Sequence, residues 1–177
     1  IRAVIFSALL FLALWPISSA LCQEEGKLEL SEGMDAVLLL DSSGSMLITD
    51  PLRLRDEGAK LFVEFLKKDD RLGIVEFSNT AKIVRPLYPV LDSERESIGR
   101  AISQIKTVGE YTDLLAPLEV AEDLFDRFPR QGARRIVIML SDGKMEPDPK
   151  VGTAEELTYR LLNMKVPDLK AKEIKVY

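Results

Sequence analysis

The chain has 177 residues, 46% of them hydrophobic and 30% charged, and is long enough to bury a core without disulfide or metal cross-links. Its formal net charge of −5 disfavours a nucleic-acid-binding protein, because phosphate binding needs a concentrated basic face. With one cysteine and no histidine, the composition excludes an internal disulfide, a Ser-His-Asp triad, a Cys-His dyad and any imidazole-dependent zinc or iron site.

Residues 1–22 have the pattern of an export signal. They are mostly apolar, Arg2 stands near the start, and Pro16 is followed by small residues, as in a cleaved signal peptide. An uncleaved membrane anchor is the alternative, since about 20 apolar residues span a bilayer. A lipoprotein modified at Cys22 is a third interpretation, which the bulky Leu21 disfavours. All three predict an exported domain that is periplasmic, extracellular or membrane-anchored.

Two continuous apolar runs, 35–40 and 134–140, predict strands buried on both faces of a parallel sheet. Residues 72–77 and 81–87 predict two further strands. The short turn between them predicts a hairpin, with the second strand antiparallel at an edge of the sheet. Residues 174–177 read as the beginning of another strand.

Helical periodicity lies between these strands. Asp50 and Pro51 are expected to cap a helix and form its first turn. The inward face of this helix is predicted to consist of Leu54, Gly58, Leu61, Phe62 and Phe65. Further helices are predicted over 93–105, over 114–128 and from Thr153 onwards. Strands that alternate with amphipathic helices predict an α/β sandwich with helices on both faces of the sheet.

Hydroxyl and carboxylate groups follow the predicted buried strands. The loop at 41–45 reads Asp-Ser-Ser-Gly-Ser, the loop at 141–143 reads Ser-Asp-Gly, and Thr-Asp at 112–113 precedes a helix. Ligands of α/β sheets bind at the carboxyl ends of the strands. Hard oxygen ligands suit Mg2+, Mn2+ or Ca2+. A shell built mainly from neutral hydroxyls leaves the cation under-neutralised, so the cation would favour an incoming carboxylate.

Each segment also has a purely structural interpretation. An Asp-Ser-Ser-Gly stretch alone is usually a turn, and Thr-Asp before a helix is usually an N-cap. Glu146 and Asp148 are interpreted as solvated loop charges rather than as ligands. The metal interpretation is favoured because all three segments fall at strand ends or helix starts, in a consistent order.

The segment Asp41-x-Ser43-x-Ser45 resembles the DxSxS motif of the von Willebrand factor type A (vWA) domain, the integrin I-domain family. Thr112 in Tyr-Thr-Asp-Leu and Asp142 in Ser-Asp-Gly are similar to the remaining metal-site residues of that family. The resemblance implies a metal-ion-dependent adhesion site (MIDAS). Ser43, Ser45 and Thr112 would contact Mg2+, with Mn2+ or Ca2+ as alternatives, and Asp41 and Asp142 would act mostly through water.

The resemblance covers residues 33–177 and is strongest to prokaryotic secreted or membrane-anchored members. It implies a Rossmann-like vWA sandwich with a mostly parallel sheet and one antiparallel edge strand. It also implies an incomplete C-terminus, because the family pattern has one more strand and a closing helix after Tyr177. Membrane attachment would come through the N-terminal segment or through a region beyond Tyr177.

The implied function is a metal-dependent protein-binding or adhesion module and not an enzyme, with the last cation position filled by a partner's Asp or Glu. The alternative is an exported metal-dependent hydrolase or phosphotransferase that uses Asp41. It is disfavoured because no Walker loop or Gly-x-Gly-x-x-Gly turn follows a predicted strand. A phosphotransferase of that kind would also carry a second aspartate where Ser43 stands. A structural protein with a vestigial metal site is the third hypothesis.

Overall fold

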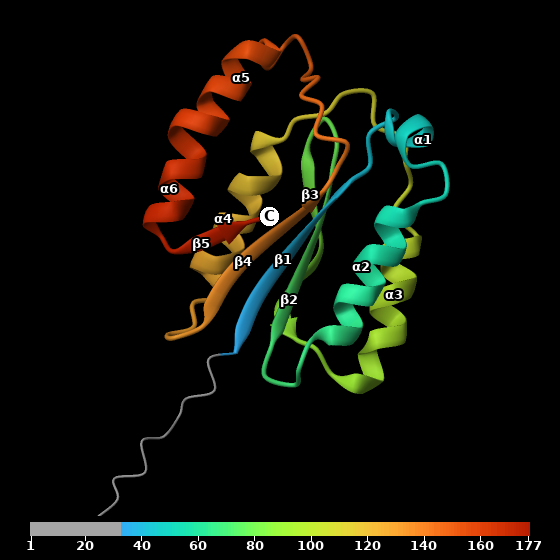
Figure 1. Cartoon of the computed structure of the whole chain (residues 1–177), viewed down its shortest axis with the longest axis vertical. Coiled ribbons are helices and arrows are strands. Elements are labelled where there is room, and N and C mark those ends of the chain that lie inside the picture. Colours follow the sequence, from blue (N-terminus) through green and yellow to red (C-terminus); the bar gives the residue numbers. More distant parts are fainter. Residues whose placement is uncertain (1–32) are drawn as a thin grey trace, which may run out of the picture.

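The computed structural model describes residues 33–177, so the predicted leader at 1–22 lies outside the described residues. Strands and helices alternate along the chain (Figure 1). The strands are β1 (Met34–Asp41), β2 (Arg71–Phe77), β3 (Ala81–Pro89), β4 (Arg134–Leu140) and β5 (Ile174–Val176). The helices are α1 (Met46–Thr49), α2 (Leu54–Phe65), the 3-10 turn η1 (Asp92–Glu94), α3 (Arg95–Ser103), α4 (Leu115–Arg127), α5 (Ala154–Arg160), the π-helical turn η2 (Leu161–Lys165) and α6 (Val166–Ala171).

The strands form one five-stranded sheet in the order β3-β2-β1-β4-β5. All neighbouring strands are parallel except β2 and β3, which form an antiparallel hairpin at one edge. Helices α2 and α3 cover one face, and α4, α5 and α6 cover the other (Figure 1). The predicted α/β sandwich is therefore confirmed, including its antiparallel edge. Within residues 33–177, none of the helices combines the length and hydropathy that crossing a bilayer requires.

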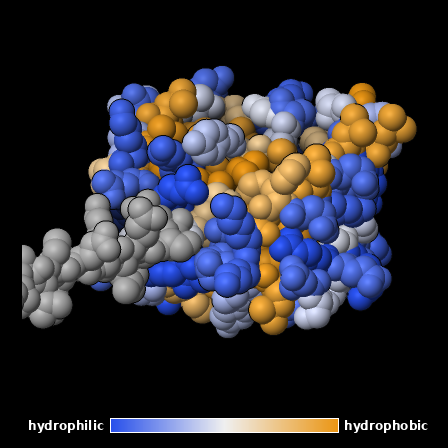
Figure 2. All heavy atoms as spheres, turned by 60° about the horizontal axis from the view of Figure 1, so that its bottom comes forward, coloured by the Kyte–Doolittle hydropathy of each residue, from blue (hydrophilic) through white to orange (hydrophobic). Residues whose placement is uncertain are grey.

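Strand β1 lies at the centre of the sheet and divides the core in two. Val37 and Leu39 pack toward Leu118 and Phe125 of α4. The alternate residues of β1 pack toward α2 and α3, because successive side chains of a strand point to opposite faces. On that second face, Ile136, Ile138 and Leu140 of β4 pack against the core but stay partly exposed. Seen from the lower end of the molecule, hydrophobic residues also reach the surface between charged ones (Figure 2).

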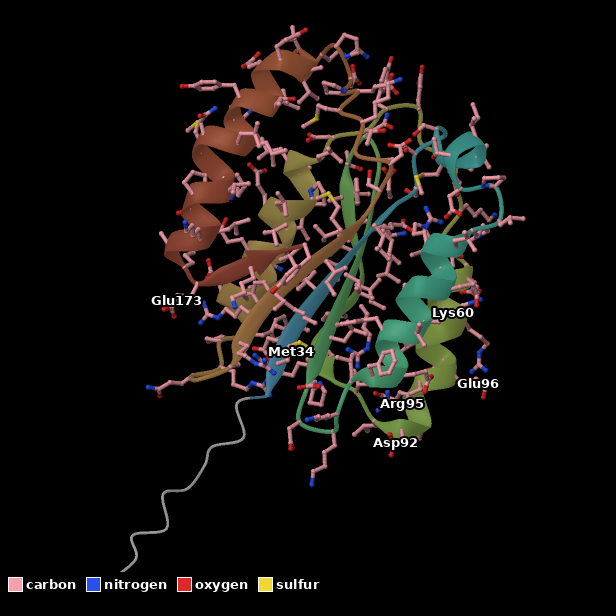
Figure 3. The ribbon with its side chains drawn as sticks, viewed as in Figure 1. Met34, Lys60, Asp92, Arg95, Glu96 and Glu173 are labelled. Atoms are coloured by element: carbon pink, nitrogen blue, oxygen red, sulfur yellow. The ribbon has the colours of Figure 1, made fainter. Side chains whose placement is uncertain are left out.

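The order of the strands places a crevice at one end of β1. From β1 the chain passes to β2 on one side, and it later returns to β4 on the other. Such a switch point is where α/β sheets bind ligands, at the carboxyl ends of the strands. Met34 marks the opposite end of β1, near the lower edge of the molecule (Figure 3). Asp41, the last residue of β1, therefore lies at the end of the sheet near α1.

Helix α2 buries a different face from the one predicted. Leu54, Leu61 and Phe65 are 65%, 58% and 74% exposed, whereas Ala59 and Val63 are buried. Of the predicted apolar face, Phe62 does pack against the core and is half-buried. At 100° per residue, the buried face is rotated by roughly a third of a turn from the predicted one. The reason is a buried ion pair on the inward side of the helix, between Arg55 Nη2 and Asp56 Oδ1 at 3.0 Å.

The beginning of α2 also differs from the prediction. Pro51 lies in the turn between α1 and α2 and not in the first turn of the helix. Asp50 does cap the helix, because its carboxylate accepts hydrogen bonds from the backbone N–H groups of Leu54 (2.6 Å) and Arg55 (2.9 Å). At the other end of α2, Arg95 of α3 donates to the carbonyl of Leu66 at 2.7 Å (Figure 3).

Candidate metal centre

Asp41 connects the two loops that leave the centre of the sheet. Its side chain is fully buried at the end of β1. One carboxylate oxygen accepts a hydrogen bond from the backbone N–H of Ser43 at 2.8 Å, and the other accepts one from the hydroxyl of Ser141 at 2.6 Å. Asp41 thus shapes its own loop and attaches it to the loop after β4.

Ser43 and Ser45 present their hydroxyl groups side by side, with the two oxygens 3.0 Å apart. Adjacent ligands of an octahedral Mg2+ with metal–oxygen bonds of 2.0–2.1 Å lie about 2.8–3.0 Å apart. The residue between them, Gly44, donates its backbone N–H to the carbonyl of Gly109 at 2.7 Å. A Cβ on Gly44 would lie 3.1 Å from that carbonyl oxygen, so the close approach favours glycine. The two hydroxyls hydrogen bond to each other at this distance, and their chemistry and spacing also suit two neighbouring positions of a hard octahedral cation.

Asp142 lies on the exposed rim of the site. One of its carboxylate oxygens accepts a hydrogen bond from the hydroxyl of Thr49 at 3.3 Å, and the other accepts one from the backbone N–H of Lys144 at 3.1 Å. Thr49 ends α1, the short helix that begins directly after Ser45. The structure therefore brings Asp142 to the segment that carries the serine pair.

Thr112 is buried in a loop held between the other two. The backbone N–H groups of Val108 and Gly109 both donate to the carbonyl of Ser42 at 3.0 Å. Thr112 itself exchanges backbone hydrogen bonds of 2.7 and 2.9 Å with Glu146, in the loop after β4. These contacts place Thr112 between the two loops that carry the other candidate ligands, and its role as a ligand stays a prediction.

The turn of the β2–β3 hairpin supports the Thr112 loop. The carbonyl of Ser78 accepts a hydrogen bond from the backbone N–H of Asp113 at 2.8 Å, and the side chain of Asn79 accepts one from Tyr111 at 2.9 Å. The carboxylate of Asp113 caps α4 by accepting from the N–H groups of Leu115 and Ala116, at 2.8 and 3.2 Å. Leu114 occupies the N-cap position of α4, so Asp113 caps the helix from one residue earlier than the N-cap interpretation assumed.

Several residues of the site carried little sequence signal. Ser141 is the serine of the Ser-Asp-Gly motif and could have been suspected there. Thr49 and Asn79 lie in a helix and a hairpin turn with no recognisable motif, and only the folded chain brings them to the site.

The surroundings of the serine pair are acidic on the side of the Thr112 loop. The neighbouring Glu110 raises the pKa of the Tyr111 hydroxyl, because a nearby negative charge disfavours the phenolate. Glu146 hydrogen bonds to Lys144 and raises the pKa of that amine. Among the residues that the structure describes, no three Asp, Glu, Cys or His side chains converge on one point. A cation at this site would depend on hydroxyl oxygens as well as carboxylates.

Comparison with solved structures agrees with this fold. Proximal thread matrix protein 1 from the mussel byssus, in a structure with a zinc-occupied MIDAS motif, matches with a TM-score of 0.61 and 20% identity, over 81% of this chain and 37% of that chain. An aerotolerance-related membrane protein from Bacteroides fragilis matches with a TM-score of 0.59 and 20% identity, over 81% of this chain and 65% of that one.

Sequence comparisons identify the family. Uncharacterized protein YfbK of Escherichia coli is 31% identical over 118 residues, which are 64% of this chain and 20% of that protein. The chain thus spans about a fifth of the length of this relative. The family model of the von Willebrand factor type A domain matches residues 36–144, a range that includes the DxSxS loop, Thr112 and Asp142. The chain belongs to the von Willebrand factor type A domain family.

Proposed function

We propose that this chain is a metal-dependent protein-binding module whose cation accepts a carboxylate from a partner protein. Ser43, Ser45 and Thr112 would contact the cation, and Asp41 and Asp142 would act mostly through water. The observation that carries the proposal is the pair of serine hydroxyls 3.0 Å apart, held beside the buried Asp41 carboxylate. Few of the ligands are charged, so a bound divalent cation keeps excess positive charge for an external Asp or Glu.

We further propose Mg2+ as the resident cation. Oxygen ligands of Ca2+, with bonds of 2.3–2.6 Å, would lie about 3.3–3.7 Å apart at right angles. The Ser43 and Ser45 hydroxyls hydrogen bond to each other at 3.0 Å, and at this separation both oxygens can bind the smaller ion without moving apart. Mn2+ also favours carboxylate and hydroxyl oxygens and is the nearest competitor.

A binding role is supported over catalysis by the state of Asp41. The hydrolase or phosphotransferase hypothesis needs this carboxylate as a nucleophile or base. Asp41 is fully buried, and its two oxygens already accept hydrogen bonds from Ser43 and Ser141. A carboxylate held in this way positions the two loops, and its burial keeps it from acting as a nucleophile on a substrate.

An exported or membrane-associated location belongs to the same proposal. It is supported by the apolar pattern of residues 1–22 and by the fold shared with a membrane protein of Bacteroides fragilis. If this domain is exported, the partner protein that supplies the carboxylate also lies outside the cytoplasm.

The proposal is tested by calorimetric titration with Mg2+, followed by titration with a short peptide that contains one glutamate. Ser45→Ala and Thr112→Ala should each weaken Mg2+ binding by at least about tenfold and abolish Mg2+-dependent peptide binding, with unchanged circular dichroism. Ser93→Ala is the matched control, since Ser93 is exposed in η1, next to Asp92 at the lower end of the molecule (Figure 3). Wild-type affinity for Mg2+ in both site variants would refute the assignment.

A further inference from the structure

The end of the sheet opposite the candidate metal centre is rich in basic side chains. The parallel register pairs Met34, the first residue of β1, with Arg134, and it pairs Asp35 with Arg71 and Arg135. Strands β1, β2 and β4 therefore all begin at this end, which we call the lower end (Figure 3). The turn before β2 and the loop before β4 lie there as well. The basic residues of these segments are Lys67, Lys68, Arg71, Arg130, Arg134 and Arg135.

Two of these basic residues are neutralised inside the fold. Arg71 Nε donates to Asp35 Oδ1 at 2.8 Å, and Arg130 Nη2 lies 2.7 Å from the same oxygen. A second buried carboxylate at this end, Asp70, accepts hydrogen bonds from two backbone N–H groups, both at 2.8 Å. The two buried carboxylates thus offset the charge of the two arginines.

The other four basic side chains keep their positive charge at the surface. All are exposed except Arg135, which is half-buried, and none forms an ion pair with a carboxylate of residues 33–177. Asp92 at the same end is already paired with Arg95 at 3.0 Å (Figure 3). Only Asp69 and Glu173 remain there as exposed carboxylates that pair with no described residue. The surface of the lower end therefore carries an excess of positive charge.

This excess stands out because the protein as a whole is acidic. The net charge of the chain is −5, so the remainder of the chain is still more negative. Around the candidate metal centre, Glu110 and Asp142 are both exposed. A domain with charges separated in this way turns its basic end toward an anionic surface.

Large apolar side chains are exposed among the basic ones. Phe65, which ends α2 just before the two lysines, is 74% exposed. Tyr88, opposite Leu72 near the start of β2, is 50% exposed, and Leu91 is 55% exposed. Figure 2, in which the lower end comes forward, shows hydrophobic residues between strongly hydrophilic ones. Aromatic and apolar side chains beside lysines and arginines are typical of surfaces that lie at a membrane interface.

We propose that the lower end of this domain lies against an anionic phospholipid bilayer. The four unpaired basic side chains contact the headgroups, and Phe65 and Leu91 reach between them. Residues 1–22 precede β1, which starts at this end, so a retained anchor would hold the same surface to the bilayer. The candidate metal centre then faces away from the membrane. This inference goes beyond the proposed function and does not depend on a bound cation.

An acidic protein is the competing occupant of a basic surface. It is disfavoured because the basic residues come from separate turns and strand starts and have exposed apolar side chains among them. Such an arrangement suits many headgroups in one plane, each of which interacts with a nearby Lys or Arg.

The test measures partition of the full chain into phosphatidylcholine vesicles, with and without phosphatidylglycerol. EDTA is present, so that no cation bridges the metal centre to a headgroup. Wild type should prefer the anionic vesicles, and Lys67→Gln/Lys68→Gln should lower partition into them by about 25-fold, at about fivefold for each charge. The same variant should partition into pure phosphatidylcholine as wild type does, because residues 1–22 are unchanged. Phe65→Ser should weaken partition into the anionic vesicles by roughly tenfold.

Lys106→Gln/Lys150→Gln is the matched control. It removes two exposed lysines from loops near the candidate metal centre and should leave partition nearly unchanged. Equal partition of wild type into both kinds of vesicle, or an equal loss in the two double variants, would overturn this inference. Binding to soluble polyglutamate that Lys67→Gln/Lys68→Gln abolishes, without a preference for anionic vesicles, would assign the lower end to an acidic protein instead. Each of these outcomes leaves the Mg2+ titrations, and with them the proposed function, unaffected.

Discussion

At the scale of single residues, Gly109 is the most constrained position near the candidate metal centre. A Cβ added there would lie 2.2 Å from the Cβ of Ser78 and 2.4 Å from its hydroxyl. The backbone of Gly109 meanwhile holds the loop that carries the serine pair, through Gly44 and Ser42. Any side chain at 109 must therefore push the Thr112 loop away from either the hairpin or the DxSxS loop.

Gly109→Ala should lower the free energy of unfolding by about 1–3 kcal/mol, because overpacking forces the backbone to shift. It should also weaken Mg2+ binding, since Thr112 moves with the loop. Urea unfolding and calorimetric Mg2+ titration measure the two effects. Gly58→Ala is the control: beyond the neighbouring backbone of its own helix, nothing lies within 4 Å of the added Cβ, and alanine in a helix interior should stabilise by about 0.5–1 kcal/mol. Unchanged stability and Mg2+ affinity in Gly109→Ala would contradict the proposed constraint.

The candidate ligands could be named from the sequence because three of them are closely spaced in one loop. Asp41, Ser43 and Ser45 match the DxSxS motif in both residue type and spacing, so they can be recognised from the sequence. The hydrogen bond from Ser141 to Asp41 joins residues 100 positions apart, and such a contact has no local signature. The tight packing of Gly109 on Ser78 cannot be predicted from the sequence either, because it depends on how the β2–β3 hairpin contacts the Thr112 loop.

At the scale of elements, strands were easier to predict than the orientation of helices. The runs that became β1 and β4 are both apolar enough to predict strands without a choice of inward side. The predicted burial on both faces is confirmed for β1 but is wrong for β4, in which only Val137 is fully buried. Helix α2 carries large apolar residues around much of its circumference, so hydrophobicity alone does not single out the inward face. The buried Arg55–Asp56 pair takes the inward position that the pattern assigned to leucine and phenylalanine.

One acidic residue of helix α4, Glu122, forms ion pairs with the C-terminal helical segment. Glu122 is 9% exposed and accepts hydrogen bonds from Lys165 of η2 and from Lys172 after α6. These two ammonium groups lower the pKa of Glu122 to about 2. Because the pKa of Glu122 is lower in the folded state than in the unfolded state, its ion pairs stabilise the fold at any pH above the ordinary Glu pKa. This stabilisation is lost as the pH falls from there toward 2.

Glu122→Gln should therefore cost about 1–3 kcal/mol of unfolding free energy at pH 7, the range for hydrogen bonds to charged groups. The difference between wild type and variant should shrink steadily below about pH 4.5. Urea unfolding from pH 7 to pH 3 measures it. Glu119→Gln, an exposed change on the same helix, should cost little at any pH. A wild-type-minus-variant difference that is the same at pH 7 and pH 3 would rule out the cluster as its source.

At the scale of the whole molecule, the candidate ligands come from three segments that the fold gathers at one end of the sheet. The segment at 41–45 follows β1, Thr112 precedes α4, and Asp142 follows β4. The hydrogen bonds that join these segments run through Asp41, Gly44 and the Thr112 backbone. A cation bound by all three segments exists only in the folded chain, so its binding free energy adds to the stability of the fold.

Mg2+ should consequently raise the stability of the whole domain by about 2.7 kcal/mol at a concentration one hundred times its dissociation constant. For a domain of this size, that corresponds to a rise in the melting temperature of roughly 5–10 °C. Differential scanning calorimetry over a Mg2+ series measures the shift, with the ionic strength held constant by NaCl. Ser45→Ala should unfold near the wild-type temperature in EDTA and show little further rise in Mg2+, because its partly exposed hydroxyl contributes mainly to the cation site. An equal Mg2+-dependent shift in wild type and Ser45→Ala would mean that the cation binds elsewhere on this acidic protein.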